Sequence, residues 1–250
     1  MKILSSVLSI IYPNNCAFCK NGMPHSDRGV YICGECMKKL AFCINTERCV
    51  KCGAPLDNPK YKLCGDCYKI RQSEETVYYD RITAPLEYDD NTKSAIVYLK
   101  KGRYLGAVGT FCALIEMMIK NDFASEKFDI VVSVPPRSGR MRKIDFDQAE
   151  IIAEGLAPRI GAKYIRGSLK RVRKTRKQSE LSRSERLMNL SGAFALRKSA
   201  ELFRGKTILV ADDVCTTGAT MNECARVLKQ AGAAKVFCAA IAKTGKNSKT

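Results

Sequence analysis

Short apolar runs alternate with amphipathic segments from residue 76 to the end of the chain. The apolar runs are rich in β-branched residues and short, which favours buried strands at 129–134, 207–211 and 236–241. Between them, apolar residues recur every three or four positions, which predicts helices at 105–119, 149–156 and 221–231. Alternation of this kind is typical of an α/β fold, a mostly parallel sheet with helices on both faces.

Two of these helices carry recognisable end signals. Asp147 precedes the second helix and Glu150 follows three residues later, a capping-box arrangement, and Pro158 interrupts the helix at its far end. The third helix ends at Gly232. These signals indicate that the second helix begins after Asp147 and that the third helix ends at Gly232.

The chain divides by composition into two parts. Residues 1–75 are rich in cysteine, glycine, proline and charge, and we expect a small N-terminal module made of a packed helix over 1–11 and metal-stabilised ribbons. Residues 76–250 are long enough to form an α/β domain with a core of their own.

Eight cysteines form four Cys-x-x-Cys pairs within the first 67 residues. A two-residue spacing lets one tight turn present two sulfurs to the same ion, and two such turns complete a closed tetrahedral site. The sequence therefore predicts two structural zinc ions, held by Cys16, Cys19, Cys33 and Cys36 and by Cys49, Cys52, Cys64 and Cys67. Four thiolates per ion leave no open position for catalysis.

Other readings of the cysteines remain open at this point. An iron–sulfur cluster, a redox-active pair or a disulfide framework would use the same residue type. Pairing within consecutive ribbons is the default, although interleaved pairs satisfy the spacing equally well. Cys43 lies between the two groups and is expected to be a buried thiol, and the lone His25 to be exposed.

Charge and histidine content restrict the function. The chain has 43 basic and 25 acidic residues, a formal charge of +18, which attracts polyanions such as nucleic acid or phosphorylated ligands. Nine basic residues lie within 166–186. One histidine in the chain excludes serine-protease-type triads and histidine-rich metal sites. No run of 18 apolar residues occurs, so we expect no transmembrane helix and a cytoplasmic protein.

The stretch 206–220, KTILVADDVCTTGAT, carries the most specific chemistry. An apolar strand ends in Asp212 and Asp213, and a loop with three threonines and Gly218 leads into a helix. Backbone amides in such a loop and at a helix start bind phosphate, while carboxylates accept hydrogen bonds from sugar hydroxyls. The order of acids and loop therefore fits a ribose 5-phosphate.

This stretch resembles the phosphoribosyl-pyrophosphate (PRPP) motif of type I phosphoribosyltransferases. The resemblance implies that Asp212 and Asp213 are catalytic, hold the ribose hydroxyls and help to place Mg²⁺. It implies a PRPP-binding loop formed by Cys215, Thr216, Thr217, Gly218, Ala219 and Thr220. The strand and loop at 131–140, VVSVPPRSGR, has the composition and place of a pyrophosphate loop, with Pro136, Arg137 and Ser138 as further PRPP-binding candidates.

A double zinc module followed by this domain is similar to the ComF competence family over nearly the whole chain. The segments 98–103 (YLKKGR), 142–150 (RKIDFDQAE) and 175–194 carry further likeness. In the second segment Asp147 stands where the family has asparagine. The resemblance implies a role in natural transformation, handling single-stranded DNA, with a partner protein of the DNA-uptake or helicase class.

Two functions of different classes follow. One is a module that binds PRPP and handles single-stranded DNA, with Arg171, Arg173, Lys174, Arg176 and Lys177 as candidate DNA contacts. The other is an active phosphoribosyltransferase that transfers phosphoribose to a nucleobase or other small acceptor and has no part in DNA uptake. The basic segment has a rival interpretation too, as a loop that closes over PRPP.

Overall fold

The computed structural model describes residues 15–24, 30–73, 75–100, 107–136, 147–173 and 189–245. Its helices are α2 (Gly34–Lys39), η1 (Cys43–Asn45), α3 (Gly65–Gln72), α4 (Asp90–Lys100), α5 (Ala107–Asp122), α6 (Gln148–Leu156), η2 (Ala157–Ile160), η4 (Ala200–Leu202) and α8 (Ala219–Gln230). Its strands are β1 (Ile82–Thr83), β2 (Leu86–Glu87), β3 (Ile130–Ser133), β4 (Lys163–Tyr164), β5 (Leu169–Arg171), β6 (Phe194–Leu196), β7 (Thr207–Cys215) and β8 (Lys235–Lys243).

Six strands form one parallel sheet in the order β1-β8-β7-β3-β4, and β2 pairs farther along β8. The strands β3, β7 and β8 occupy the centre; β3 and all but the first residue of β8 are buried, and β7 is buried from residue 208 to 211 and again at Cys215. Both faces of a parallel sheet need a cover, which explains their near-continuous apolar sequence. The predicted α/β class with a mostly parallel sheet is confirmed.

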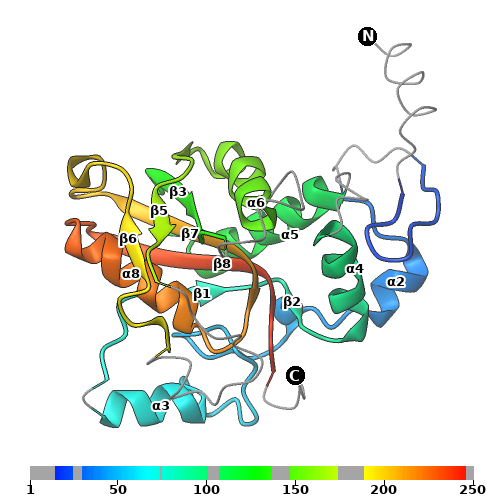
Figure 1. Cartoon of the computed structure of the whole chain (residues 1–250). Coiled ribbons are helices and arrows are strands. Elements are labelled where there is room, and N and C mark those ends of the chain that lie inside the picture. The colour runs from blue at the N-terminus through cyan, green and yellow to red at the C-terminus, as the bar shows by residue number, and fades with distance from the viewer. Residues whose placement is uncertain are drawn as a thin grey trace, which may run out of the picture.

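Alternate residues of the central strands enter two separate cores. Leu209 and Phe237 pack with α4, α5 and α6 on one face, whereas Ile208 and Val236 pack with α8 on the other. Figure 1 shows α8 and the pair α5 and α6 on opposite sides of the sheet. The antiparallel hairpin β5–β6 adds to the second core through Leu169 and Phe194.

The predicted strands and helices are present, with revised ends. The strand expected to end at residue 211 continues through the two aspartates to Cys215, because the neighbouring β8 is equally long and pairs with it throughout. The side chain of Asp147 caps α6 by accepting a hydrogen bond from the Glu150 amide at 3.1 Å. The helix predicted over 1–11 lies outside the described residues, as does His25. None of the helices in the described ranges is long and apolar enough to cross a membrane.

The first ribbon, residues 15–40, packs on the helices at one side of the sheet. The Phe18 ring meets Phe111 of α5 edge-on with 5.9 Å between centroids, and the Tyr31 amide donates to the Thr110 hydroxyl at 3.0 Å. Lys20 places its ammonium 3.4 Å from the ring centroid of Tyr98 in α4. Figure 1 shows α2 of this ribbon near α4, well away from α3 of the second ribbon.

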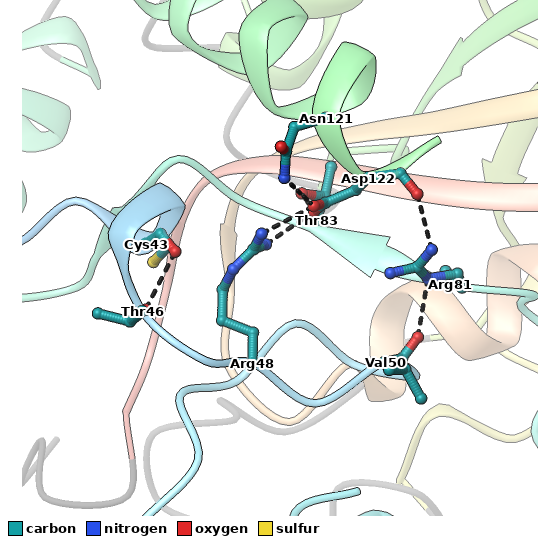
Figure 2. A network of polar contacts seen from close by, with 8 residues as sticks. All are labelled: Cys43, Thr46, Arg48, Val50, Arg81, Thr83, Asn121 and Asp122. Atoms are coloured by element: carbon teal, nitrogen blue, oxygen red, sulfur yellow. Dashed lines mark hydrogen bonds and ion pairs between the residues drawn. The ribbon is translucent and has the colours of Figure 1, made fainter. Parts of the chain in front are cut away.

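The second ribbon, residues 47–73, docks on β1 and the end of α5 through a buried ion pair. Both terminal nitrogens of Arg48 donate to the Asp122 carboxylate at 2.7 Å, and the Thr83 hydroxyl donates to the same group. The side chains of Arg48 and Asp122 are 11% and 6% exposed. Figure 2 shows this network, in which Arg81 also bridges the carbonyls of Val50 and Asp122.

The environment of this pair favours the charged forms. Burial raises the pKa of Asp122, but the hydrogen bonds from Arg48 and Thr83 outweigh it and hold that pKa below its usual value. The Asp122 carboxylate raises the pKa of Arg48 against the opposing effect of burial.

Residues of the first ribbon, such as Leu40, belong to the same core as α5. The composition of the chain changes near residue 75. The division into two domains at this residue stays a prediction.

We expect Asp122→Asn to destabilise the protein by about 3–5 kcal/mol, because it leaves the buried Arg48 guanidinium without its charge partner. Since the native pKa of Asp122 is lowered, the stability that this carboxylate contributes is present at neutral pH and is lost as pH falls through that lowered pKa. Urea unfolding of both proteins at several pH values measures this, and the difference should shrink toward acid.

Asp129→Asn is the matched control, because Asp129 forms an ion pair with Lys206 in which the side chains are 42% and 46% exposed. It should cost less than about 1 kcal/mol. Equal effects of the two substitutions would mean that the buried pair contributes no more than an exposed one.

Candidate functional site

The eight paired cysteines form two separate clusters. The ligand sulfurs of Cys16, Cys19, Cys33 and Cys36 lie within 4.8 Å of one another, and so do those of Cys49, Cys52, Cys64 and Cys67. Sulfurs bound tetrahedrally at about 2.3 Å from one zinc ion stand roughly 3.8 Å apart. The clusters fit that geometry, with 3.6 Å between the sulfurs of Cys19 and Cys33 and between those of Cys52 and Cys64.

This grouping of the sulfurs excludes two alternatives that the cysteine spacing left open, interleaved pairs and a disulfide framework. The clusters join consecutive pairs, so interleaving of the pairs does not occur. None of the thirteen cysteines forms a disulfide in the structure, and separations of 3.6 Å between sulfurs far exceed a disulfide bond of about 2.05 Å. Cys43 is fully buried, as expected, and burial raises the pKa of its thiol to about 12.

The two clusters differ in how far they are covered. In the first, Cys19 is exposed and Cys33 and Cys36 are half-buried, whereas every cysteine of the second is buried. The difference follows from docking, because the second ribbon lies against β1 and the Arg48–Asp122 pair while the first is held mainly by Phe18, Tyr31 and Lys20. Solvent and chelators therefore reach the first site more easily.

The carboxyl ends of β3, β7 and β8 meet at one edge of the sheet, where ligands of open parallel sheets bind. Asp212 and Asp213 lie half-buried near the end of β7. Their carboxylates accept hydrogen bonds from the amides of Asp213 and Val214, respectively, both at 2.8 Å. These local bonds hold the acids in place at the sheet edge.

The candidate phosphate loop turns sharply at Gly218, which has a φ of +81° and caps the start of α8. A side chain is disfavoured there by conformation and by space, since a Cβ would lie 3.1 Å from Cδ1 of Ile82. The Ala219 amide donates to the Thr217 hydroxyl at 3.4 Å. Cys215 and Ala219 are buried, so only their backbone is available to a ligand, while Thr216, Thr217 and Thr220 are partly exposed.

Lys243 is a buried cation beneath this loop that sequence reasoning missed. It ends β8 opposite Cys215 and is 4% exposed. Its ammonium donates to the Thr216 carbonyl, which fixes the loop from below. The signal in the sequence was a single lysine at the end of the apolar run 236–242, where a buried strand otherwise excludes charge.

Other predicted residues are placed only in part. Pro136 follows β3 at the same sheet edge and is half-buried, whereas Arg137 and Ser138 lie outside the described residues. Asp147, at the start of α6, faces the same region: burial raises its pKa, the hydrogen bond from the Glu150 amide opposes this, and the negative charges of Glu150 and Asp213 add to the rise. The edge thus gathers several carboxyl groups, a donor set suited to a hard cation such as Mg²⁺.

Among the candidate DNA contacts, Arg171 and Arg173 are described and both contact the hairpin region. The guanidinium of Arg171 lies 4.6 Å from the ring centroid of Phe194 across the β5–β6 ladder. Arg173 donates to the carbonyls of Asn189 and Ser191 at 2.9 and 2.8 Å. Lys174, Arg176 and Lys177 lie outside the described residues.

Comparison with known proteins agrees with both halves of the chain. The double zinc ribbon domain matches residues 7–68, and the phosphoribosyl transferase domain matches residues 113–250. The DNA utilization protein YhgH of Salmonella typhimurium is 28% identical over 90% of this chain and 94% of its own length. Competence protein F of Haemophilus influenzae is 24% identical over 88% and 93%, and competence protein ComFC of Bacillus subtilis 27% over 81% and 80%, respectively.

We expect a chelator to remove zinc in two phases, because the first cluster is partly exposed and the second is buried. A metallochromic dye records release over time, starting from two zinc ions per chain. Cys19→Ser should abolish the fast phase and leave the slow one, and Cys52→Ser is the matched variant for the slow phase. Release of both ions in one phase would show that burial does not control access.

Proposed function

Because the chain belongs to the phosphoribosyl transferase domain family, we propose that it binds PRPP with Mg²⁺ at the carboxyl edge of β7. The observation that carries the proposal is the succession of Asp212, Asp213 and the turn at Gly218 on one strand, loop and helix. The carboxylates accept hydrogen bonds from the ribose hydroxyls, and the backbone amides at the start of α8 bind the 5-phosphate.

The resemblance to the ComF family, made on sequence motifs, is confirmed by the two domain matches in this order and by the relatives with competence names. We propose for this chain a role in the use of incoming DNA; the relatives' names, DNA utilization protein and competence protein, support this proposal. The formal charge of +18 supports contact with a polyanion.

The chemistry available at this edge also suits transfer of the phosphoribosyl group. Mg²⁺, when bound, neutralises the charge that develops on departing pyrophosphate. The residues of the chain orient the ribose through Asp212 and Asp213 and hold the phosphate through the loop that Lys243 fixes. No histidine takes part in these steps. Transfer to a nucleobase or another small acceptor is the alternative function, and a pyrophosphate-release screen over acceptors in the presence of PRPP tests it.

We expect Asp213→Asn and Thr217→Val each to weaken PRPP binding by about 1–3 kcal/mol, because the first replaces a charged acceptor by a neutral amide and the second removes a partly buried hydroxyl. Titration calorimetry with Mg²⁺ and PRPP measures the affinity. Asp129→Asn is the control, since Asp129 precedes β3 at the opposite edge of the sheet. Unchanged affinity in both site variants would place the PRPP site elsewhere, and no binding by the unaltered protein would end the proposal.

The DNA proposal is tested on the three basic residues that lie outside the described part. Arg171 and Arg173 stay unaltered, because they contact Phe194 and the carbonyls of Asn189 and Ser191. Replacing Lys174, Arg176 and Lys177 by serine should flatten the slope of log affinity against log salt on single-stranded DNA by about 2, roughly 0.7 per lost phosphate contact.

Serine at the exposed Lys38, Lys127 and Lys198 is the charge-matched control. If the triple variant of Lys174, Arg176 and Lys177 keeps the salt slope on DNA and loses affinity for PRPP instead, the result favours the rival interpretation, in which this basic segment closes over PRPP. An unchanged slope would in either case end the assignment of DNA contacts to these residues.

A further inference from the structure

The second zinc ribbon reaches the phosphate loop through one intervening segment, residues 76–83. On one side this segment contacts the turn between Cys49 and Cys52, and on the other it contacts Gly218 and α8. We infer that the second zinc ribbon is a positioning element of the phosphate loop, so that its docking sets the affinity for a phosphate ligand. This inference rests on the proposed function for its ligand, PRPP, and on the contacts in the structure for its geometry.

The ribbon holds this segment by backbone and side chain. The Ile82 amide donates to the Lys51 carbonyl at 3.0 Å, which joins the zinc turn to the start of β1. The ammonium of Lys51 donates to the Tyr79 carbonyl at 2.6 Å and lies 5.3 Å from the ring centroid of Tyr79. Lys51 therefore anchors Tyr79 and Ile82 at once.

The same two residues touch the phosphate loop from beneath. A Cβ on Gly218 would lie 3.1 Å from the Ile82 side chain and 3.6 Å from the Tyr79 hydroxyl, so both side chains pack directly on the turn. Tyr79 and Ile82 are 4% and 3% exposed. Asn222, in the first turn of α8, accepts from the Tyr78 amide at 2.7 Å, which ties the helix start to the same segment.

Gly53 shows that the contact between ribbon and segment is close. Its φ is +71°, but the corresponding residue of the first ribbon is Lys20, at a φ of 69°, so the zinc turn accepts a side chain in this conformation. What excludes a side chain at Gly53 is space, because a Cβ there would lie 2.7 Å from the Ile82 carbonyl oxygen. Glycine at this position serves the docking of the ribbon and not the turn itself.

The test substitutes Gly53→Asn, because asparagine tolerates a positive φ and adds a Cβ that must push Ile82 away. Gly205→Asn is the matched control, since Gly205 has a φ of +69° with open space around its Cβ position. Three measurements are made on the full-length protein: zinc per chain, amide hydrogen exchange over residues 216–222, and calorimetric affinity for PRPP with Mg²⁺.

We expect Gly53→Asn to keep two zinc ions, to exchange severalfold faster over 216–222, and to bind PRPP about 3- to 30-fold more weakly, the range for substitutions that act through a network. Gly205→Asn should match the unaltered protein. Wild-type exchange and affinity in Gly53→Asn with two zinc ions bound would overturn the inference.

Lys51→Met keeps the inference testable if Gly53→Asn loses zinc, because it removes the bond to Tyr79 and adds no steric clash. Lys60→Met, at an exposed position of the same ribbon, is its control. Lys51→Met should speed amide exchange over residues 216–222, and Lys60→Met should not. Equal exchange rates in the two variants would overturn the inference. If the unaltered protein fails to bind PRPP, the proposed function fails, and hydrogen exchange still decides the coupling.

Discussion

The buried pair of Arg48 and Asp122 joins the two compositional parts of the chain. Taking both charges out of water costs several kcal/mol per ion, and the cost is offset only by close geometry and further hydrogen bonds. The structure provides these through two nitrogen–oxygen contacts at 2.7 Å and the Thr83 hydroxyl. The second ribbon is thereby fixed in one position on the end of α5 and on β1. The burial of its zinc cluster and its contact with residues 76–83 follow from that position.

The sequence predicted the parts of the structure whose signal is local. Short apolar runs revealed β3, β7 and β8, and apolar residues three or four positions apart revealed the helices that cover them, because a buried strand leaves a continuous apolar run and an amphipathic helix leaves a repeating pattern. Asp147 revealed the start of α6 for the same reason, since a cap and its helix are neighbours in the chain. The cysteine spacing predicted two metal clusters because each zinc turn is closed by residues three apart.

Features that join distant residues escaped prediction. Arg48 and Asp122 are 74 residues apart, and nothing in either neighbourhood marks them as partners. Lys243 reaches the phosphate loop only because β7 and β8, nine residues each, pair and place it opposite Cys215. Short strands such as β1 and β2, two residues long, leave too little pattern to detect. The hairpin β5–β6 was hidden for a related reason, since its residues lie beside a basic run that dominates the composition.

The long separation of the docking contacts has a consequence for the order of folding during synthesis. The zinc ribbons leave the ribosome before α5 does, and metal can close each of them without the rest of the chain. The docking sites of the ribbons on α5 are synthesised later: Thr110 lies 79 residues after Tyr31, and Asp122 lies 74 residues after Arg48. Until then Arg48 stays hydrated and the apolar underside of each ribbon is uncovered. The ribbons can therefore close before their docking partner exists, and their docking depends on contacts of long sequence separation, a class of contact associated with slow folding.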